Sequence, residues 1–181
     1  ADTFAGRIGA DHILEAVFGH QAEGLFAQTK NIHIIACGTS FHSGLVAKYW
    51  LEDMAGVPCQ VEVASEYRYR KVAVPDGTLF VTISQSGETA DTLAALHKAK
   101  ESGYLGFVAI CNVANSSLVR ESDISLMTMA GPEIGVASTK AFTTQLVALQ
   151  LLTLSLGRHT GLPAGLEAEW VTNLNPLQGL C

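Results

Sequence analysis

The sequence has few charged residues and no surplus of positive charge. Asp, Glu, Lys and Arg make up 15% of its 181 residues, and 11 Lys and Arg stand against 17 Asp and Glu, a formal net charge of −6. Proteins that bind nucleic acid take much of their affinity from basic side chains, so this balance argues against nucleic acid as a partner. One small phosphate group is still compatible with it, because backbone N–H groups can bind a phosphate locally. The apolar share of 48% excludes a disordered chain.

Long hydrophobic runs are also missing. The most apolar stretch, residues 146–156, is interrupted by Gln150, Thr153 and Ser155, whereas a membrane-spanning helix needs about 20 consecutive apolar residues. We therefore expect no membrane association. The first residues lack Met and show no charged segment followed by an apolar one, as a signal peptide would. We expect a cytoplasmic protein, present here as a trimmed piece of a longer chain.

Paired cysteine motifs are absent as well. The sequence has four widely spaced cysteines and no CxxC pair: Cys37, Cys59, Cys111 and Cys181. A domain of this size needs no disulfides, so we expect reduced thiols, and the sequence predicts no metal site. Cys37 lies near His33 and His42 in the sequence, which would allow a nucleophile pair. The favoured interpretation is a small buried thiol at the end of a strand.

Three familiar catalytic or phosphate-binding motifs do not occur. Gly38 is followed by Gly44, which does not match the GxGxxG of dinucleotide-binding proteins, although Glu62 lies about where a ribose-binding acid would be. There is no GxxxxGK[ST] of nucleoside triphosphatases and no GxSxG of hydrolases. A dinucleotide-dependent enzyme is thus a weak alternative.

Alternating strand and helix patterns are what the sequence does contain. Short apolar runs predict five strands, at residues 31–36, 60–63, 78–84, 105–111 and 124–127. Helical spacing occurs at residues 13–30, after residue 40 up to Gly56, after residue 88 up to Gly103, at 136–156 and at 162–170. The strands are nearly all apolar, which predicts burial on both faces in a parallel sheet. The sequence therefore predicts an α/β fold in three layers with right-handed crossovers.

The expected organisation is one domain with two flanking segments. Residues 1–30 are a helical lead-in, residues 31–160 the domain, and residues 161–181 the start of a helical connection. Residues 136–156 are apolar nearly all round the helix, which implies burial against the sheet and against a partner or a missing domain. We therefore expect the chain to self-associate. The charged and aromatic residues 65–71 are interpreted as a solvated helix face.

Two turns rich in Ser and Thr follow the first and third predicted strands. One holds Gly38, Thr39 and Ser40, and the other spans residues 84–89. Ligands of parallel α/β proteins bind at the carboxyl ends of the strands, and both turns precede helices whose first N–H groups can hold a phosphate. The alternative is that these hydroxyls only cap the helices. Residues 133–140 form a third loop of this kind, again with a capped helix start as the alternative.

Six stretches of the sequence resemble a known family. They are ACGTS (36–40), ASEYRYR (64–70), SQSGETADTL (84–93), ICNV (110–113), SSLVRESD (116–123) and EIGVASTKAFTTQ (133–145). Together they resemble the first sugar-isomerase (SIS) half of the glutamine:fructose-6-phosphate amidotransferases. SQSGET alone would indicate only an SIS domain, whereas GVASTKAFTTQ is specific to the amidotransferases.

The resemblance implies a flavodoxin-like SIS domain with a five-stranded parallel sheet, in a cytoplasmic homodimer. It implies fructose 6-phosphate or glucosamine 6-phosphate as ligand, with a glutaminase domain and a second SIS domain in the intact chain. The positions that match the family's phosphate ligands are Ser40, Ser84, Gln85, Ser86 and Thr89. Those that match its sugar contacts are Cys37, Gly38, Thr39, Val136 and Ser138.

The family's catalytic groups have no counterpart in the sequence. The glutaminase domain lies before the matching region, and the proton-transferring base, the ring-opening histidine and the Schiff-base lysine lie beyond it. Glu88, Glu133 and Lys140 match no catalytic position, so we expect a binding unit without cofactor, metal or catalytic residues of its own. A stand-alone SIS module that senses a sugar phosphate is the second hypothesis, and the dinucleotide enzyme is the third.

Overall fold

The structure, a computed structural model, describes residues 3–4, 6–132, 139–174 and 176. Its centre is a five-stranded sheet in the order β2-β1-β3-β4-β5, with every neighbouring pair parallel. The strands are β1 (Asn31–Ala36), β2 (Cys59–Val63), β3 (Thr78–Ser84), β4 (Gly106–Cys111) and β5 (Ile124–Met127). This order is the flavodoxin-like one. The predicted fold class is confirmed, and the five predicted strands all appear within one residue of their expected bounds.

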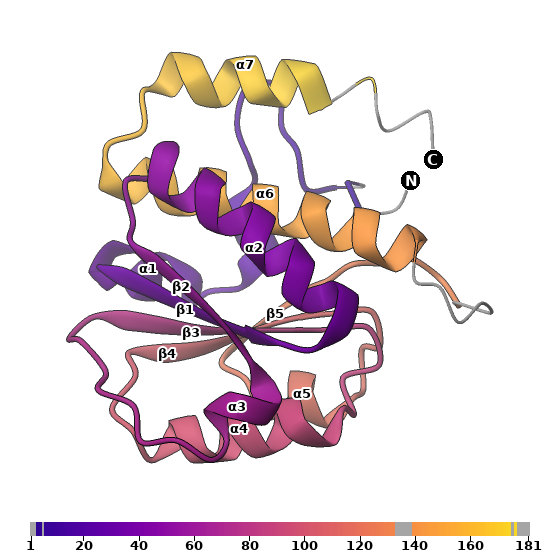
Figure 1. The fold of residues 1–181 in the computed structure, drawn as a ribbon. Helices are drawn as coiled ribbons and strands as arrows, with labels where there is room; N and C mark the ends of the chain where they lie inside the picture. Colours follow the sequence, from indigo (N-terminus) through magenta and orange to yellow (C-terminus); the bar gives the residue numbers. More distant parts are fainter. Residues whose placement is uncertain (1–2, 5, 133–138, 175, 177–181) are drawn as a thin grey trace.

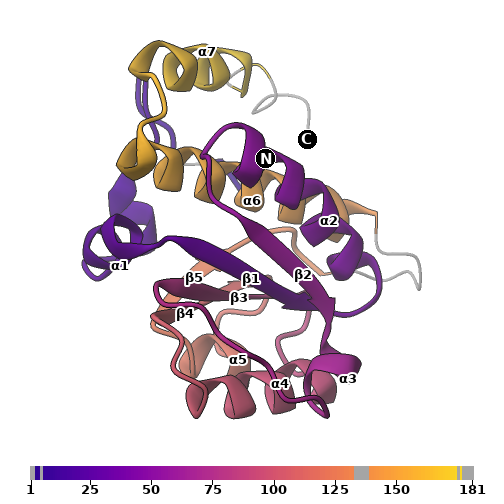
Figure 2. The ribbon, with the colours of Figure 1, turned by 60° about the vertical axis from the view of Figure 1, so that its left-hand side comes forward.

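Helices cover both faces of this sheet (Figure 1). One face carries α1 (Ala22–Gln28), α2 (Gly38–Asp53) and α6 (Lys140–Thr160), and the other carries α3 (Ala64–Tyr67), α4 (Ala90–Lys100) and α5 (Ser117–Arg120). The turned view in Figure 2 shows the same three layers, with α7 (Ala164–Leu174) outside α2 and α6, farthest from the sheet. Each face buries its own cluster of apolar side chains. No helix among the described residues has the length and apolar character that a membrane span requires.

The helix expected over residues 13–30 is interrupted. A single 3-10 turn, Glu15–Phe18, is separated from α1 by Gly19, whose φ of 85° is incompatible with a continuing right-handed helix. Ile13 precedes both and forms an isolated antiparallel bridge with Ile8. Apolar spacing alone did not reveal this break, because the segments on both sides of Gly19 bury apolar side chains in the same core.

Burial on both faces holds for the central strands and is incomplete at the two edges; in the edge strand β5, Ser125 and Met127 are partly exposed. All of β3 is buried, whereas in β2 Gln60 is exposed and Val61, Glu62 and Val63 are partly exposed. The reason is position: β2 is an edge strand that pairs only with β1. A short apolar run in the sequence does not distinguish an edge strand from a central one.

Residues 65–71 are a solvated surface only in part: Glu66, Tyr69, Arg70 and Lys71 are exposed, but the helix ends at Tyr67. Tyr67 is fully buried at the end of α3, and its ring lies 5.5 Å from that of Phe80 on β3. The flanking arginines are paired: Arg68 Nη1 lies 2.6 Å from Asp91 Oδ1 on α4, and Arg70 Nε lies 2.6 Å from Glu62 Oε1 on β2. The segment therefore fastens the edge of the sheet to α4.

A buried polar cluster lies beneath this segment. His33 Nδ1 is 2.8 Å from Tyr104 Oη, and the Tyr67 hydroxyl donates to the same oxygen at 3.2 Å. On the other side of the ring, His33 Nε2 is 3.4 Å from Glu62 Oε2, in a geometry that forms no hydrogen bond. Burial lowers the pKa of His33, although the Glu62 carboxylate opposes that shift. The imidazole is thus held in its neutral form.

The far side of α6 is covered by this chain itself. Leu149, Leu152 and Leu156 are fully buried, and they share one core with Val171 and Leu174 of α7. Helices α1 and α2 pack against α6 as well. The expectation that a partner or a missing domain buries this helix was wrong, because α7 and the N-terminal segment had not been recognised as its cover.

Candidate functional site

Two turns meet at one end of the sheet. One follows β1 and leads into α2, and the other follows β3 and leads into α4. Strands β1 and β3 are neighbours, with Ala36 beside Ile83, so the turns leave the sheet side by side. Figure 1 shows both helices beginning at this end of the sheet, on the right. The structure thus brings together the two segments that the sequence singled out.

The turn after β3 is closed by its own hydroxyl groups. Ser84 Oγ accepts the N–H of Gly87 at 2.9 Å, and Ser86 Oγ accepts the N–H of Glu88 at 3.2 Å. Ser84 Oγ also lies 3.4 Å from Thr89 Oγ1. Gly87 has a φ of 67°, a left-handed conformation that suits glycine and lets the chain reverse towards α4.

Helix α5 supports this turn from outside. Glu88 Oε1 accepts the N–H of Ser117 at 2.7 Å, and the N–H of Leu118 donates to the Gly87 carbonyl oxygen at 3.1 Å. Hydrogen bonds from Ser117 lower the pKa of Glu88, so this exposed carboxyl group stays ionised. Its role in the structure is to hold the turn against the start of α5.

The turn after β1 is held by a buried glutamine. Gln145, on α6, donates from Nε2 to Ser40 Oγ at 3.0 Å, and its Oε1 accepts from Ser43 Oγ at 3.3 Å. Ser43 Oγ also donates to the Ser40 carbonyl oxygen at 2.7 Å. The sequence interpretation missed Gln145 and Ser43. A polar residue inside an otherwise apolar helical pattern is the one signal that could have indicated the glutamine.

The first residues of α2 and α4 test the alternative that the hydroxyl groups of the turns only cap these helices. Cys37 precedes α2 and Thr89 precedes α4, and neither side chain makes a capping hydrogen bond. The N–H groups of a first helical turn have no partner within the helix and carry a partial positive charge. At these two helices the N-cap side chains leave those N–H groups available to an anion.

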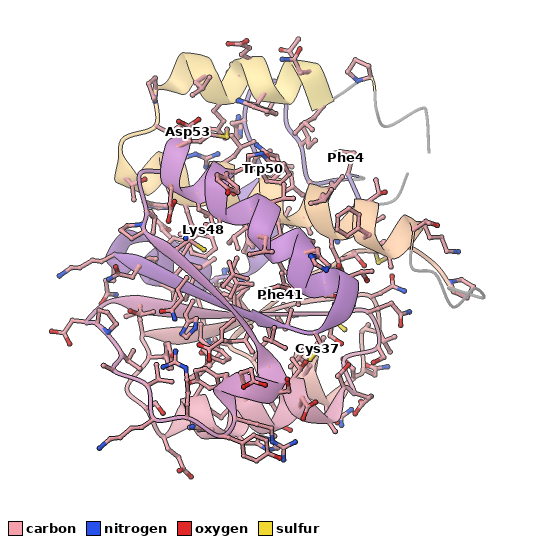
Figure 3. The ribbon with its side chains drawn as sticks, viewed as in Figure 1. Phe4, Cys37, Phe41, Lys48, Trp50 and Asp53 are labelled. Atoms are coloured by element: carbon pink, nitrogen blue, oxygen red, sulfur yellow. The ribbon has the colours of Figure 1, made fainter. Side chains whose placement is uncertain are left out.

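Cys37 lies where β1 leaves the sheet and α2 begins, with Phe41 one turn further along the helix (Figure 3). It is a free thiol and is partly exposed, so the buried thiol expected there was wrong in degree. His33 points into the polar cluster with Tyr104 and does not form a nucleophile pair with Cys37. Among the described residues, no group of three or more His, Cys, Asp and Glu side chains is placed to hold a metal ion.

Two of the expected sugar contacts lie outside the described residues. These are Val136 and Ser138, and Glu133 of the same loop lies outside them as well. Of the remaining sugar contacts, Gly38 and Thr39 are exposed on the first turn of α2. The phosphate candidates Gln85, Ser86 and Thr89 are partly exposed, and Ser40 and Ser84 are buried beneath them.

The structure has a hollow at the opposite end of the sheet. It is lined by Asn31, Pro58, Val74, Thr78 and Tyr104, among others, at the amino ends of the strands. Ligands of parallel α/β folds bind at the carboxyl ends, where first-turn N–H groups converge. We therefore assign the candidate site to the two turns.

Comparison with known proteins places this site in a family. The model of the SIS domain matches residues 25–155, which include both turns. The chain belongs to the SIS domain family. The expected SIS domain is thereby confirmed, and the relatives described next confirm the resemblance to the amidotransferases.

The SIS domain has relatives of high identity. It is 68% identical over 176 residues to the glutamine--fructose-6-phosphate aminotransferase [isomerizing] of Pseudomonas putida, and 66% identical to that of Pseudomonas aeruginosa. Both matches cover 97% of this chain and 29% of the relative. The chain therefore spans less than a third of the length of these enzymes.

Solved structures agree with the sequence comparison. The C-terminal domain of glucosamine-fructose-6-phosphate aminotransferase from Francisella tularensis superposes with a TM-score of 0.95 at 53% identity, over 99% of this chain and 50% of that one. A glucosamine-6-phosphate deaminase from Thermotoga maritima superposes with a TM-score of 0.67 at 22% identity, over 90% of this chain and 50% of that one. At that identity the second match shows the fold alone.

Proposed function

We propose that this SIS domain is the phosphosugar-binding unit of a glutamine--fructose-6-phosphate aminotransferase. Its ligand is fructose 6-phosphate or the product glucosamine 6-phosphate. The glutaminase domain, a second SIS domain and the catalytic groups belong to the rest of the intact chain, which acts as a homodimer in the cytoplasm. The identity of 68% to such an enzyme supports this assignment.

The two adjacent turns carry the proposal. Their helix starts lack capping side chains, and hydroxyl groups surround them. A phosphate monoester is small and doubly charged, and it accepts several hydrogen bonds at once, so converging N–H and O–H donors suit it. Ser40, Ser84, Gln85, Ser86 and Thr89 would hold the phosphate in this proposal. The sugar would contact Cys37, Gly38, Thr39, Val136 and Ser138.

Titration calorimetry of the purified chain tests this assignment. Fructose 6-phosphate should bind and fructose should not, because the phosphate supplies most of the contacts. Ser86→Ala should weaken the binding of fructose 6-phosphate by about 1.5–3 kcal/mol, the range for a hydrogen bond to a charged group. Ser122→Ala is the matched control, since that hydroxyl donates to the Leu118 carbonyl oxygen at 2.8 Å, at the far end of α5. Equal affinities of Ser86→Ala and the parent would contradict the phosphate assignment.

The alternatives make different predictions. A ligand at about 100 times its Kd stabilises a protein by about 2.7 kcal/mol, so a thermal-shift screen separates a dinucleotide enzyme from a phosphosugar-binding unit. Stabilisation by NAD and not by hexose phosphates would favour the dinucleotide enzyme. A sensor module would also bind the sugar phosphate, but the intact protein would then show no transfer of ammonia from glutamine to the sugar.

A further inference from the structure

Three serine hydroxyls of the candidate site share one feature: each accepts a hydrogen bond from the protein. The donors are Gly87 N–H for Ser84 Oγ, Glu88 N–H for Ser86 Oγ and Gln145 Nε2 for Ser40 Oγ. A hydroxyl group carries one hydrogen and can accept through its lone pairs. That bond uses one of the two lone pairs of each oxygen and leaves the hydroxyl hydrogen available for a ligand.

The rest of the site adds donors. First-turn N–H groups of α2 and α4 can only donate, and their partial positive charge favours the ligand with the greater negative charge. Ser84 and Thr89, whose hydroxyl oxygens are 3.4 Å apart, can share one hydrogen between them and direct the other outward. Gln85 is the one phosphate candidate with an acceptor oxygen in its side chain, and its carboxamide can turn the NH2 group towards an anion.

We propose, on the basis of the proposed function, that this donor-rich site binds its sugar phosphate preferentially as the dianion, and that Gln145 is the positioning residue that directs the hydrogen of Ser40 towards the ligand. A phosphate monoanion carries a P–OH group, which needs an acceptor. In the arrangement above most groups that face the phosphate are donors, so protonation of the ligand replaces a favourable acceptor with a further donor and weakens binding.

Gln145 is well placed for this role. Its side chain is 2% exposed, and it comes from α6, more than 100 residues after Ser40. Ser43 Oγ lies 2.7 Å from the Ser40 carbonyl oxygen and 3.3 Å from Gln145 Oε1, so its one hydrogen is shared between these acceptors, and the carboxamide lies with its NH2 group beside Ser40. The arrangement needs no charged side chain, so the donor character of Ser40 is set by packing.

Charged and titratable groups around the turns could also produce a pH dependence. On the described elements these are Cys37 and His42 of α2, Arg68 beside α3, Glu88 and Asp91 at the start of α4, Arg120 of α5 and Lys140 of α6. Asp91 is paired with Arg68, and Glu88 is held by the N–H of Ser117. The experiment must therefore separate protonation of the ligand from protonation of the protein.

A pair of ligands achieves that separation. The second pKa of a phosphate ester is about 6, whereas a sulfate ester has a similar shape and keeps a single negative charge over the whole pH range of the experiment. If only the dianion binds, the Kd of fructose 6-phosphate rises about tenfold between about pH 7.5 and about pH 5, because roughly one molecule in eleven is then a dianion. A change in the Kd of fructose 6-sulfate between the two pH values reports protonation of the protein. In the His42→Gln variant, the Kd of fructose 6-phosphate must still rise tenfold.

The outcomes are distinct. A larger rise in Kd for the phosphate than for the sulfate supports a site that prefers the dianion. Where the sulfate binds too weakly to measure, a rise for the phosphate that is retained in His42→Gln supports it as well. Equal changes for both ligands, or a flat profile for the phosphate, overturn it while leaving the proposed function intact. If neither ligand binds at either pH, the proposed function fails and this inference fails with it.

Variants of Gln145 test the positioning role. Gln145→Glu offers only acceptor oxygens and would take the hydrogen of Ser40, so we expect the Kd of fructose 6-phosphate to rise more than tenfold. Gln145→Met removes the donor without adding a charge and should raise it several-fold, with no further rise when combined with Ser40→Ala. Gln150→Met is the matched control on the same helix. Its Oε1 has no hydrogen-bond partner, and it should leave the Kd unchanged. Additive effects of Ser40→Ala and Gln145→Met would overturn the positioning role.

Discussion

Two glycines, one before and one after α4, allow the energetic cost of backbone strain to be distinguished from that of a steric clash. Gly87 and Gly103 have φ values of 67° and 78°, so alanine at either position costs about 1–2 kcal/mol of left-handed strain. A Cβ at Gly103 would meet nothing within 4 Å, whereas one at Gly87 would lie 2.1 Å from Ser116 Oγ and 2.8 Å from Cys111 Sγ. We expect Gly103→Ala to lower the free energy of unfolding by the strain alone. Gly87→Ala should lower it by about 1–3 kcal/mol more, because overpacking adds to the strain.

Urea denaturation of the two variants measures this difference, and titration with fructose 6-phosphate gives a second test. Only Gly87→Ala should weaken binding, since it pushes the turn at residues 84–89 away from α5. Equal losses of stability in the two variants would mean that Ser116 moves away from the added Cβ at no energetic cost.

The buried imidazole of His33 should give the protein a pH-dependent stability. Burial lowers the pKa of His33 from its usual value of 6.5, so between about pH 7 and about pH 5 the unfolded chain binds more protons than the folded one. The free energy of unfolding therefore falls as the pH is lowered through this range. In His33→Gln, which keeps a hydrogen-bonding group near Tyr104, we expect this fall to be smaller.

Denaturation curves at several pH values above about 5 measure the effect. The pKa of Glu62 is lowered by Arg70, and its contribution is lost only below the usual value of 4.5, so it stays outside this window. His20→Gln, at an exposed position, is the control and should keep the slope of the parent. A His33→Gln protein with the parent's slope would assign the pH dependence to other groups.

At the scale of residues, the sequence predicted which turns converge and did not predict what holds them. Ser40, Ser84 and Ser86 follow strand patterns, and the carboxyl ends of neighbouring parallel strands meet at one edge. Gln145 and Glu88 act through contacts to α2 and α5 that exist only in the folded chain. Periodicity and spacing contain no information about such pairings.

Helix α6 contains a hydroxyl group that lowers its stability. Ser155 Oγ is fully buried and has no hydrogen-bond partner, and burying an unpaired hydroxyl costs about 1–3 kcal/mol. Ala also has the higher helix propensity, so Ser155→Ala should raise the free energy of unfolding by about 1 kcal/mol. Thr153→Val is the control: Thr153 Oγ1 donates to the Leu149 carbonyl oxygen at 2.8 Å, so its removal should bring no gain. Thermal and urea denaturation would show both effects, and a loss on Ser155→Ala would refute the argument.

At the scale of elements, the strands were more predictable than their surroundings. A strand buried on both faces is apolar throughout, which a sequence displays directly, and β1, β3 and β5 have the bounds predicted for them. Less could be inferred from the sequence about which other segments pack against each element. The sequence did not reveal that α7 covers α6, that β2 lies at an edge, or that Tyr67 turns into the core.

For the whole molecule, we expect binding without turnover. The chain spans 29% of the length of its Pseudomonas relatives, and in the proposed function the base, the ring-opening group and the ammonia source belong to the rest of the intact chain. General acid–base groups alone contribute about 100- to 10,000-fold to a reaction rate. The purified chain, incubated with fructose 6-phosphate and ammonium, should therefore form neither glucose 6-phosphate nor glucosamine 6-phosphate.

An enzymatic assay for both products provides the measurement. Binding of fructose 6-phosphate by the same preparation is the positive control, because it shows that the site is folded. Turnover that Glu88→Gln abolishes would place a catalytic base in this domain and contradict the division of labour proposed here.

The hydrogen bond between Gln145 and Ser40 also bears on how the protein is made. Ser40, Ser84 and Ser86 leave the ribosome before Gln145, which orients Ser40 and follows it by 105 positions. Domains fold as units, and α6 shares one core with the sheet, so the domain can be completed only after α6 has been made. A ligand stabilises only the state that binds it, and a sugar phosphate at this site could therefore stabilise the domain only from that point on.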